Sequence, residues 1–81
     1  MQKSLKGFEL RYDNVADMVE VGDSVEIAIT DDGRSRVGKV KSVGDREIEL
    51  DGSAKLRSSG LSVVYEAGTG YGFEAREVTL L

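Results

Sequence analysis

Short segments in which apolar and polar residues alternate are the feature that most constrains the fold of this chain. Between residues 24 and 30, the side chains of Val25, Ile27 and Ile29 alternate with small or polar residues. A period of two residues is typical of a β-strand that buries one of its faces. Similar segments recur at 7–12, 35–43, 47–50, 61–65 and 73–81. The sequence therefore predicts a chain made mostly of short strands.

Turn signals separate these segments. Residues 31–33, Asp-Asp-Gly, predict a tight hairpin turn, because Asp-Gly readily takes the positive φ angles that such turns need. Gly38 interrupts the alternation of its strand and predicts a bulge or a sharp bend. Residues 56–59 are expected to form a connection that Gly60 closes.

One short segment carries a helical pattern instead. Asn14 is a good N-cap residue, and Val15, Met18 and Val19 follow it at helical spacing. The expected fold is all-β: a small five- to six-stranded barrel or barrel-like sandwich with at most a short helical turn near 14–20. Residues 1–81 are expected to form a single small β domain.

The in-phase apolar positions of the expected strands give a predicted core. A domain of 81 residues buries a modest share of its surface, so this core is expected to be thin. Its predicted members are Phe8, Leu10, Val25, Ile27, Ile29, Val40, Ile48, Leu50, Leu61, Val63, Val78 and Leu80.

The residue types that the chain lacks exclude several kinds of site. The absence of cysteine excludes disulfide bonds and thiolate metal sites. Histidine, the side chain best suited to proton transfer near neutral pH, is also missing. The glycine-rich segment 68–72 lacks the Gly-Lys-Ser/Thr ending of a phosphate-binding loop, and Asp31 with Asp32 supplies too few oxygen ligands for calcium. We therefore expect no enzymatic activity, no cofactor and no metal site.

The distribution of apolar residues also bears on location. No apolar run exceeds four residues, whereas a transmembrane helix needs about twenty. The two lysines of segment 1–6 precede no apolar stretch of the kind found in secretory signals. The expected location is cytoplasmic.

Charge is distributed unevenly along a chain whose net charge is −4. Between residues 33 and 46 a single acid, Asp45, accompanies five basic residues, which we call the basic stripe: Arg34, Arg36, Lys39, Lys41 and Arg46. Such a stripe can follow the phosphates of a nucleic acid. The alternative is that these cations pair across strands with the neighbouring acids Glu26, Glu47 and Glu49.

The segment between Val25 and Leu50 resembles a known family. It reads Val25-x-Ile27-x-Ile29-x-x-Asp32-Gly33, followed by Gly38-x-Val40 and then Val43, Asp45, Ile48 and Leu50. This pattern resembles the first motif of the Sm-like RNA-binding proteins, and it is similar to the hairpins of SH3-like barrels of the KOW type. The base-contacting Asn of the Sm-like family has no counterpart, since Ile48 and Glu49 stand in its place. The resemblance therefore implies a small barrel and carries over no functional residue.

Two kinds of partner remain open. The first interpretation is a non-catalytic binding module for a protein partner or for a second copy, because the apolar, β-prone segment 61–66 would form an adhesive strand edge. A homodimer would then use this strand or the C-terminal segment 78–81. The candidate interface residues are Leu61, Val63, Val64, Tyr65 and Tyr71. The second interpretation is a small barrel that binds nucleic acid weakly through the basic stripe. We expect no membrane partner.

Overall fold

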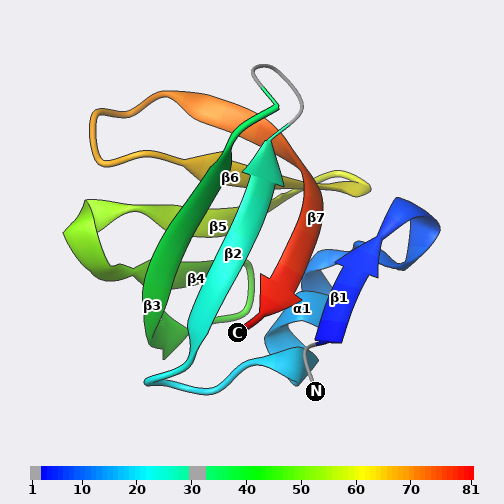
Figure 1. Ribbon diagram of the computed structural model, residues 1–81, viewed down its shortest axis with the longest axis horizontal. Coiled ribbons are helices and arrows are strands. Elements are labelled where there is room, and N and C mark those ends of the chain that lie inside the picture. Colours follow the sequence, from blue (N-terminus) through cyan, green and yellow to red (C-terminus); the bar gives the residue numbers. More distant parts are fainter. Residues whose placement is uncertain (1–2, 30–32) are drawn as a thin grey trace.

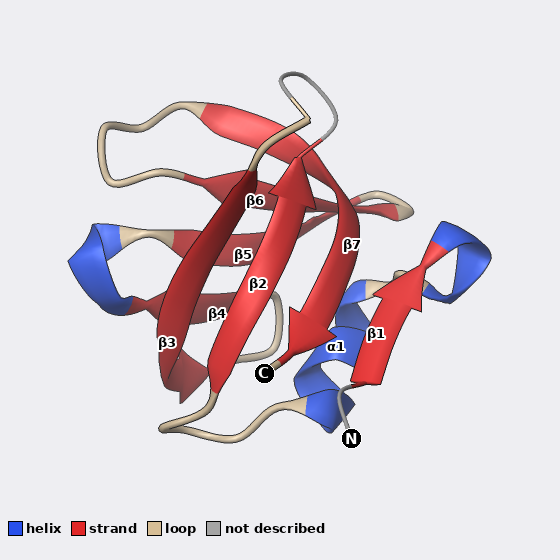
Figure 2. Ribbon diagram, viewed as in Figure 1, coloured by secondary structure: helices blue, strands red, loops and turns tan. Residues whose placement is uncertain are grey.

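The computed structural model describes residues 3–29 and 33–81 of the chain. Its elements, in chain order, are β1 (Lys3–Lys6), the 3₁₀ turn η1 (Gly7–Glu9), α1 (Tyr12–Met18), β2 (Ser24–Ile29), β3 (Ser35–Val43), β4 (Glu47–Leu50), the 3₁₀ turn η2 (Asp51–Ser53), β5 (Lys55–Ser59), β6 (Ser62–Glu66) and β7 (Gly72–Leu80). Strands make up most of the body of the molecule (Figure 2). The prediction of an all-β fold is confirmed. The predicted turn at Asp31 and Asp32 lies outside the described residues.

The strands close into a barrel. In the order β7-β2-β3-β4-β5-β6, each strand pairs with the next in antiparallel fashion, and β6 pairs back with β7. Strand β1 lies outside this ring, on the end of β7 that leads to the C-terminus (Figure 1). Six strands in a ring match the predicted small barrel, and β1 is an addition that the alternation did not show.

Strand β3 bends from one half of the barrel to the other. It pairs with β2 from Ser35 to Lys39 and with β4 from Val40 to Val43. The register with β4 shifts between Val40 and Ser42, which leaves Lys41 as the extra residue of a bulge. Gly38 faces the core before this bulge, and a Cβ there would lie 3.1 Å from Leu50 Cδ1. The irregularity predicted for this strand is therefore present, three residues beyond the glycine.

The core confirms most of the predicted set. The buried members of that set are Leu10, Val25, Ile27, Ile29, Val40, Ile48, Leu50, Val63 and Val78. Leu80 is partly buried and packs against this cluster. Two predictions are wrong, because the side chains of Phe8 and Leu61 are 85% and 77% exposed. Phe8 lies in η1 and Leu61 in the turn before β6, so neither side chain projects from the inner face of a strand.

The N-terminal segment departs from its prediction. The strand expected at 7–12 is wrong: a strand ends at Lys6, and Gly7, at φ 61°, turns the chain into η1. The helix covers Tyr12–Met18 instead of 14–20, and Val15 is its most deeply buried residue. Asn14 does not cap this helix; its side-chain amide donates to the Glu9 carbonyl at 2.8 Å. The period of two at 8, 10 and 12 thus arises in a turn and a helix start.

The connection expected at 56–59 is also wrong. Strand β5 spans Lys55–Ser59 and pairs with both β4 and β6. Its inward position, Leu56, is buried, while Lys55 and Arg57 face outward. Among the described residues, no helix is long and apolar enough to cross a membrane.

Candidate functional site

The barrel has a seam beside β7, where two partner strands leave a gap. The β7 ladder with β6 ends at the pair Val64–Glu74, and its ladder with β1 begins at Lys6–Glu77. Within the described part of the chain, no strand pairs with Ala75 or Arg76 on this side. On the other side, the β2 register passes from Ala75 to Glu77, so Arg76 is the extra residue of a bulge. Bulges increase local twist, which lets β6 and β1 diverge at this point.

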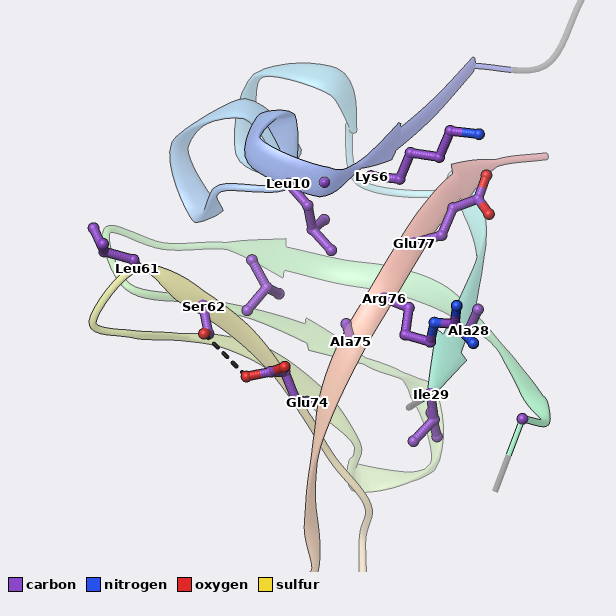
Figure 3. A pocket seen from close by; sticks show the side chains of 13 residues that line it. Lys6, Leu10, Ala28, Ile29, Leu61, Ser62, Glu74, Ala75, Arg76 and Glu77 are labelled. Carbon is purple, nitrogen blue, oxygen red and sulfur yellow. Dashed lines mark hydrogen bonds between the residues drawn. The ribbon is translucent and has the colours of Figure 1, made fainter. Parts of the chain in front are cut away.

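A groove of about 840 Å³ opens along this seam. We call it the seam groove (Figure 3). Its floor consists of the buried apolar side chains of Leu10, Ile29, Val63 and Ala75. Leu10 points down between β7 and the turn that carries Leu61, as Figure 3 shows. A concave surface with an apolar floor is the usual form of a binding site.

One strongly exposed apolar side chain lines the seam groove, and a second belongs to a residue next to its lining. Leu61 lines one bank and is 77% exposed. Gly7 lines the other, and its neighbour Phe8 is 85% exposed. Two hydrogen bonds brace the turn that carries this ring: Arg11 Nε donates to the Phe8 carbonyl at 3.1 Å, and Asn14 Nδ2 donates to the Glu9 carbonyl. A braced backbone presents the aromatic ring at a reduced entropic cost of binding.

The charges along the seam groove are balanced. Lys6 and Arg76 are basic, and Glu74 and Glu77 are acidic. Lys6 and Glu77 face each other in the β1–β7 register, and Ser62 Oγ donates to Glu74 Oε2 at 3.1 Å. Equal numbers of the two signs give this surface no strong preference for a partner of one charge.

The structure distributes the predicted interface residues over several surfaces. Val63 and Tyr65 are buried, whereas Val64 is partly buried on the outer face of β6. Leu61 and the 71%-exposed Tyr71 lie beyond opposite ends of β6. Of the predicted set, only Leu61 and Val63 line the seam groove.

The strand edges expected to be adhesive are largely occupied. From Val64 to Glu66, β6 pairs with β5 on one side and with β7 on the other. The C-terminal half of β7 lies between β1 and β2. Ser62 and Val63 pair with β5 alone in the described ladders, so the open part of this edge borders the seam groove.

The basic stripe lies mainly on the surface of β3 and its flanking turns. Lys39 and Lys41 are exposed on either side of the buried Val40, and Arg34 and Arg46 are exposed as well. Arg36, opposite Ile27 in the β2–β3 register, is partly buried. The stripe is therefore not a single uniform patch.

Two of the three acids expected to neutralise the basic stripe, Glu47 and Glu49, are engaged elsewhere. Glu47 Oε2 pairs with Lys55 Nζ at 3.2 Å, and Glu49 Oε1 accepts from Ser42 Oγ at 2.7 Å. Within residues 3–29 and 33–81, no carboxylate lies at ion-pair distance from Lys39 or Lys41. The cross-strand pairing interpretation thus does not account for these two lysines.

A cross-strand charge network covers the outer face of β4, β5 and β6. Lys55 Nζ lies 3.8 Å from Glu66 Oε2 as well as near Glu47, and Arg57 Nε donates to Glu66 Oε1 at 3.1 Å. The hydrogen bond that Lys55 Nζ donates to Glu47, followed by the negative charge of Glu47, raises the pKa of Lys55 above its ordinary value. With Glu49, three glutamates share this face with two cations, and Glu74, which also lines the seam groove, lies at its border. We call this surface the acidic face.

The remaining candidates from the sequence gain no support as chemical sites. Among the described residues, no polar or charged side chain is buried, and no cluster of three acids could hold a metal ion. In the glycine-rich loop, a Cβ on Gly68 would lie 2.6 Å from the Gly52 carbonyl oxygen, so this glycine serves close packing against η2. Comparisons with models of known protein families, with curated proteins and with solved structures give no match.

Proposed function

We propose that this chain is a non-catalytic protein-binding module whose site is the seam groove. The observation that supports it best is the exposure of Leu61 beside an apolar floor, with the exposed Phe8 next to Gly7 of the same lining. Large exposed apolar side chains gathered at one place mark interaction surfaces, and aromatic side chains are enriched among the residues that dominate binding energy. The open backbone edge at Ser62 and Val63 adds hydrogen-bonding groups that a partner segment in extended conformation can use.

Site-specific photocrosslinking tests this proposal. The natural chain has no cysteine, so Leu61→Cys gives one attachment point for a benzophenone maleimide in the groove. Glu49→Cys places the same group on the acidic face as a matched control. We expect protein adducts from position 61, in purified protein or with cell extract, and few from position 49. Adducts at 61 should fall when Phe8→Ser is added.

The result that overturns the proposal is equally definite. Equal labelling from positions 61 and 49, or no adduct from position 61 under either condition, removes the seam groove as a binding site. Adducts at position 61 that Phe8→Ser leaves unchanged would show contact without the predicted apolar anchor, and the proposed role of Phe8 would be wrong.

A second candidate function is weak nucleic-acid binding through the basic stripe. The observation that favours it is that Lys39 and Lys41 are exposed on a bent strand with no carboxylate at ion-pair distance among the described residues. Lysines in such positions can contact phosphates, with little dependence on base sequence. The acids Asp51 and Glu49 nearby and the net charge of −4 limit the expected affinity.

A salt titration with mixed single-stranded RNA tests this candidate. We expect micromolar or weaker binding by fluorescence anisotropy, a steep loss with added salt, and further loss in the Lys39→Glu, Lys41→Glu double variant. The double variant Lys55→Glu, Arg57→Glu, which changes charge equally on another face, is the control. No binding at low salt eliminates the candidate, and binding that both double variants reduce equally reflects net charge alone.

We also propose that the barrel is of the small SH3-like or Sm-like kind. The bent β3, with Gly38 packed against Leu50 and a bulge at Lys41, supports this relation. Inter-strand NOEs that require a strand order other than β7-β2-β3-β4-β5-β6 would contradict it.

A further inference from the structure

We infer that the partner in the seam groove is a second copy of this chain, an inference that rests on the proposed protein-binding function. A two-fold dimer buries the same patch on both copies, so the patch must be complementary to itself. Three properties of the seam groove satisfy this condition: its shape, its charges and its contrast with the rest of the surface.

The shape pairs a projecting apolar side chain with an apolar hollow on one patch. Leu61 projects into solvent from the turn between β5 and β6. Beside it, Leu10 and Ala75 form part of an apolar floor, in a groove of about 840 Å³. In a two-fold arrangement, Leu61 of each copy enters the groove of the other, and both apolar surfaces leave water.

The charges of the seam groove allow the same arrangement. Lys6 and Arg76 balance Glu74 and Glu77, so a copy turned by a two-fold rotation can place basic groups against acidic ones. The acidic face, with three glutamates and two cations besides the shared Glu74, is less evenly balanced and so less suited to face its own copy. On a chain of net charge −4, a balanced apolar patch is better suited to self-association than the acidic face.

Sedimentation equilibrium tests the inference on the intact chain. We expect the wild type to reach twice the 8.8-kDa chain mass at high micromolar concentration. Leu61→Lys should weaken the dimer by about tenfold or more, because it places a charge over an apolar floor. Tyr71→Lys is the matched control: it replaces an equally exposed side chain beyond the other end of β6, and it should leave the dimer intact. Circular dichroism serves as the control that each variant is folded.

Each outcome supports or overturns the inference. A wild type that stays monomeric at high micromolar concentration overturns it, as does a dimer that Leu61→Lys leaves unchanged or that both lysine variants weaken equally. The crosslinking experiment separates this failure from that of the proposed function. A monomeric chain whose position 61 still crosslinks other proteins in extract, in a manner dependent on Phe8, has a foreign partner in the seam groove. A monomeric chain that gives no such adducts contradicts both the dimer and the proposed protein-binding function.

Discussion

The hydroxyl of Tyr12 donates a 2.6 Å hydrogen bond to the carbonyl oxygen of Gly44, which fixes the start of α1 to the turn between β3 and β4. The two residues are 32 positions apart in sequence, and the ring of Tyr12 belongs to the core. Burial, followed by the charges of nearby carboxylates, Glu47 first, raises the pKa of Tyr12 above its ordinary value of 10.0. This one side chain therefore closes the core and anchors a turn.

Tyr12→Phe keeps the ring and removes the donor. We expect the free energy of unfolding to fall by about 1 kcal/mol, because the Gly44 carbonyl loses its partner while the packing is retained. Urea denaturation followed by circular dichroism measures this change. An unchanged transition midpoint would show that water replaces the hydroxyl at no cost.

The raised pKa of Tyr12 predicts that stability depends on pH in the alkaline range. Because folding raises the pKa of Tyr12, its contribution is fully present below pH 10 and is lost as the pH rises through the folded-state pKa. Lys55, whose pKa is also raised, loses its contribution in the same direction. We expect the free energy of unfolding to decline above pH 10, and to decline less steeply in Tyr12→Phe. Parallel declines in the two proteins would assign the effect to other groups.

The opposite environments of Ile27 and Phe8 predict opposite effects on stability. Ile27 is fully buried, so Ile27→Ala should lower the free energy of unfolding by about 2–5 kcal/mol through lost transfer energy and a cavity. Phe8→Ser, at an 85%-exposed position, should change it by less than about 0.5 kcal/mol. Thermal and urea unfolding measure both. A large loss in Phe8→Ser would mean that the ring packs against the barrel.

The close approach of Gly38 and Leu50 predicts that added volume at this bend is costly. The new methyl of Gly38→Ala would lie 3.1 Å from Leu50 Cδ1 and 3.2 Å from its Cβ, and overpacking of this kind typically costs about 1–3 kcal/mol. Adding Leu50→Val should recover part of that loss, so the two changes should be non-additive in a double-mutant cycle. If the losses of the two substitutions are strictly additive, the loss of stability in Gly38→Ala arises from the backbone of β3 and not from contact with Leu50.

The position of Val64 predicts that it takes no part in self-association. Val64 lies on the acidic face, and a Cβ added at Gly72 would lie 3.3 Å from Val64 Cγ1. At this residue β6 pairs with β5 on one side and with β7 on the other. Sedimentation of Val64→Lys should therefore match the wild type at every concentration. Dissociation in this variant would move the interface from the seam groove to the outer face of β6.

Residues with a strict period of two were predictable from the sequence, because alternation records which face of a strand is buried. Val25, Ile27 and Ile29 show this most clearly, and their burial is complete. The sequence does not predict strand β5, because Leu56 is its one fully buried large apolar residue and the charged residues Lys55 and Arg57 flank it. Those two charges are stabilised by glutamates on adjacent strands, a tertiary effect that local sequence does not report.

The candidate site was less predictable, because it depends on where ladders end. Leu61 could be singled out from its apolar character, but its exposure follows from its place in a turn. Ala75 and Arg76 carry no sequence signal for the seam, which arises where β6 and β1 diverge along β7. The alternation around Phe8 resembles that of a strand and predicts a core position, whereas Gly7 turns the chain away.

The most direct test of the seam groove as an interface is a dilution series of ¹⁵N-labelled wild-type protein, with backbone amide shifts followed by NMR. Amides whose shifts depend on concentration report the surface at which copies meet. We expect those changes to centre on Leu10, Ser62, Val63, Ala75 and Arg76, and to be absent from Glu49 and Arg57 on the acidic face. Shifts that do not depend on concentration, or that centre on β3 or on the acidic face, would contradict the account.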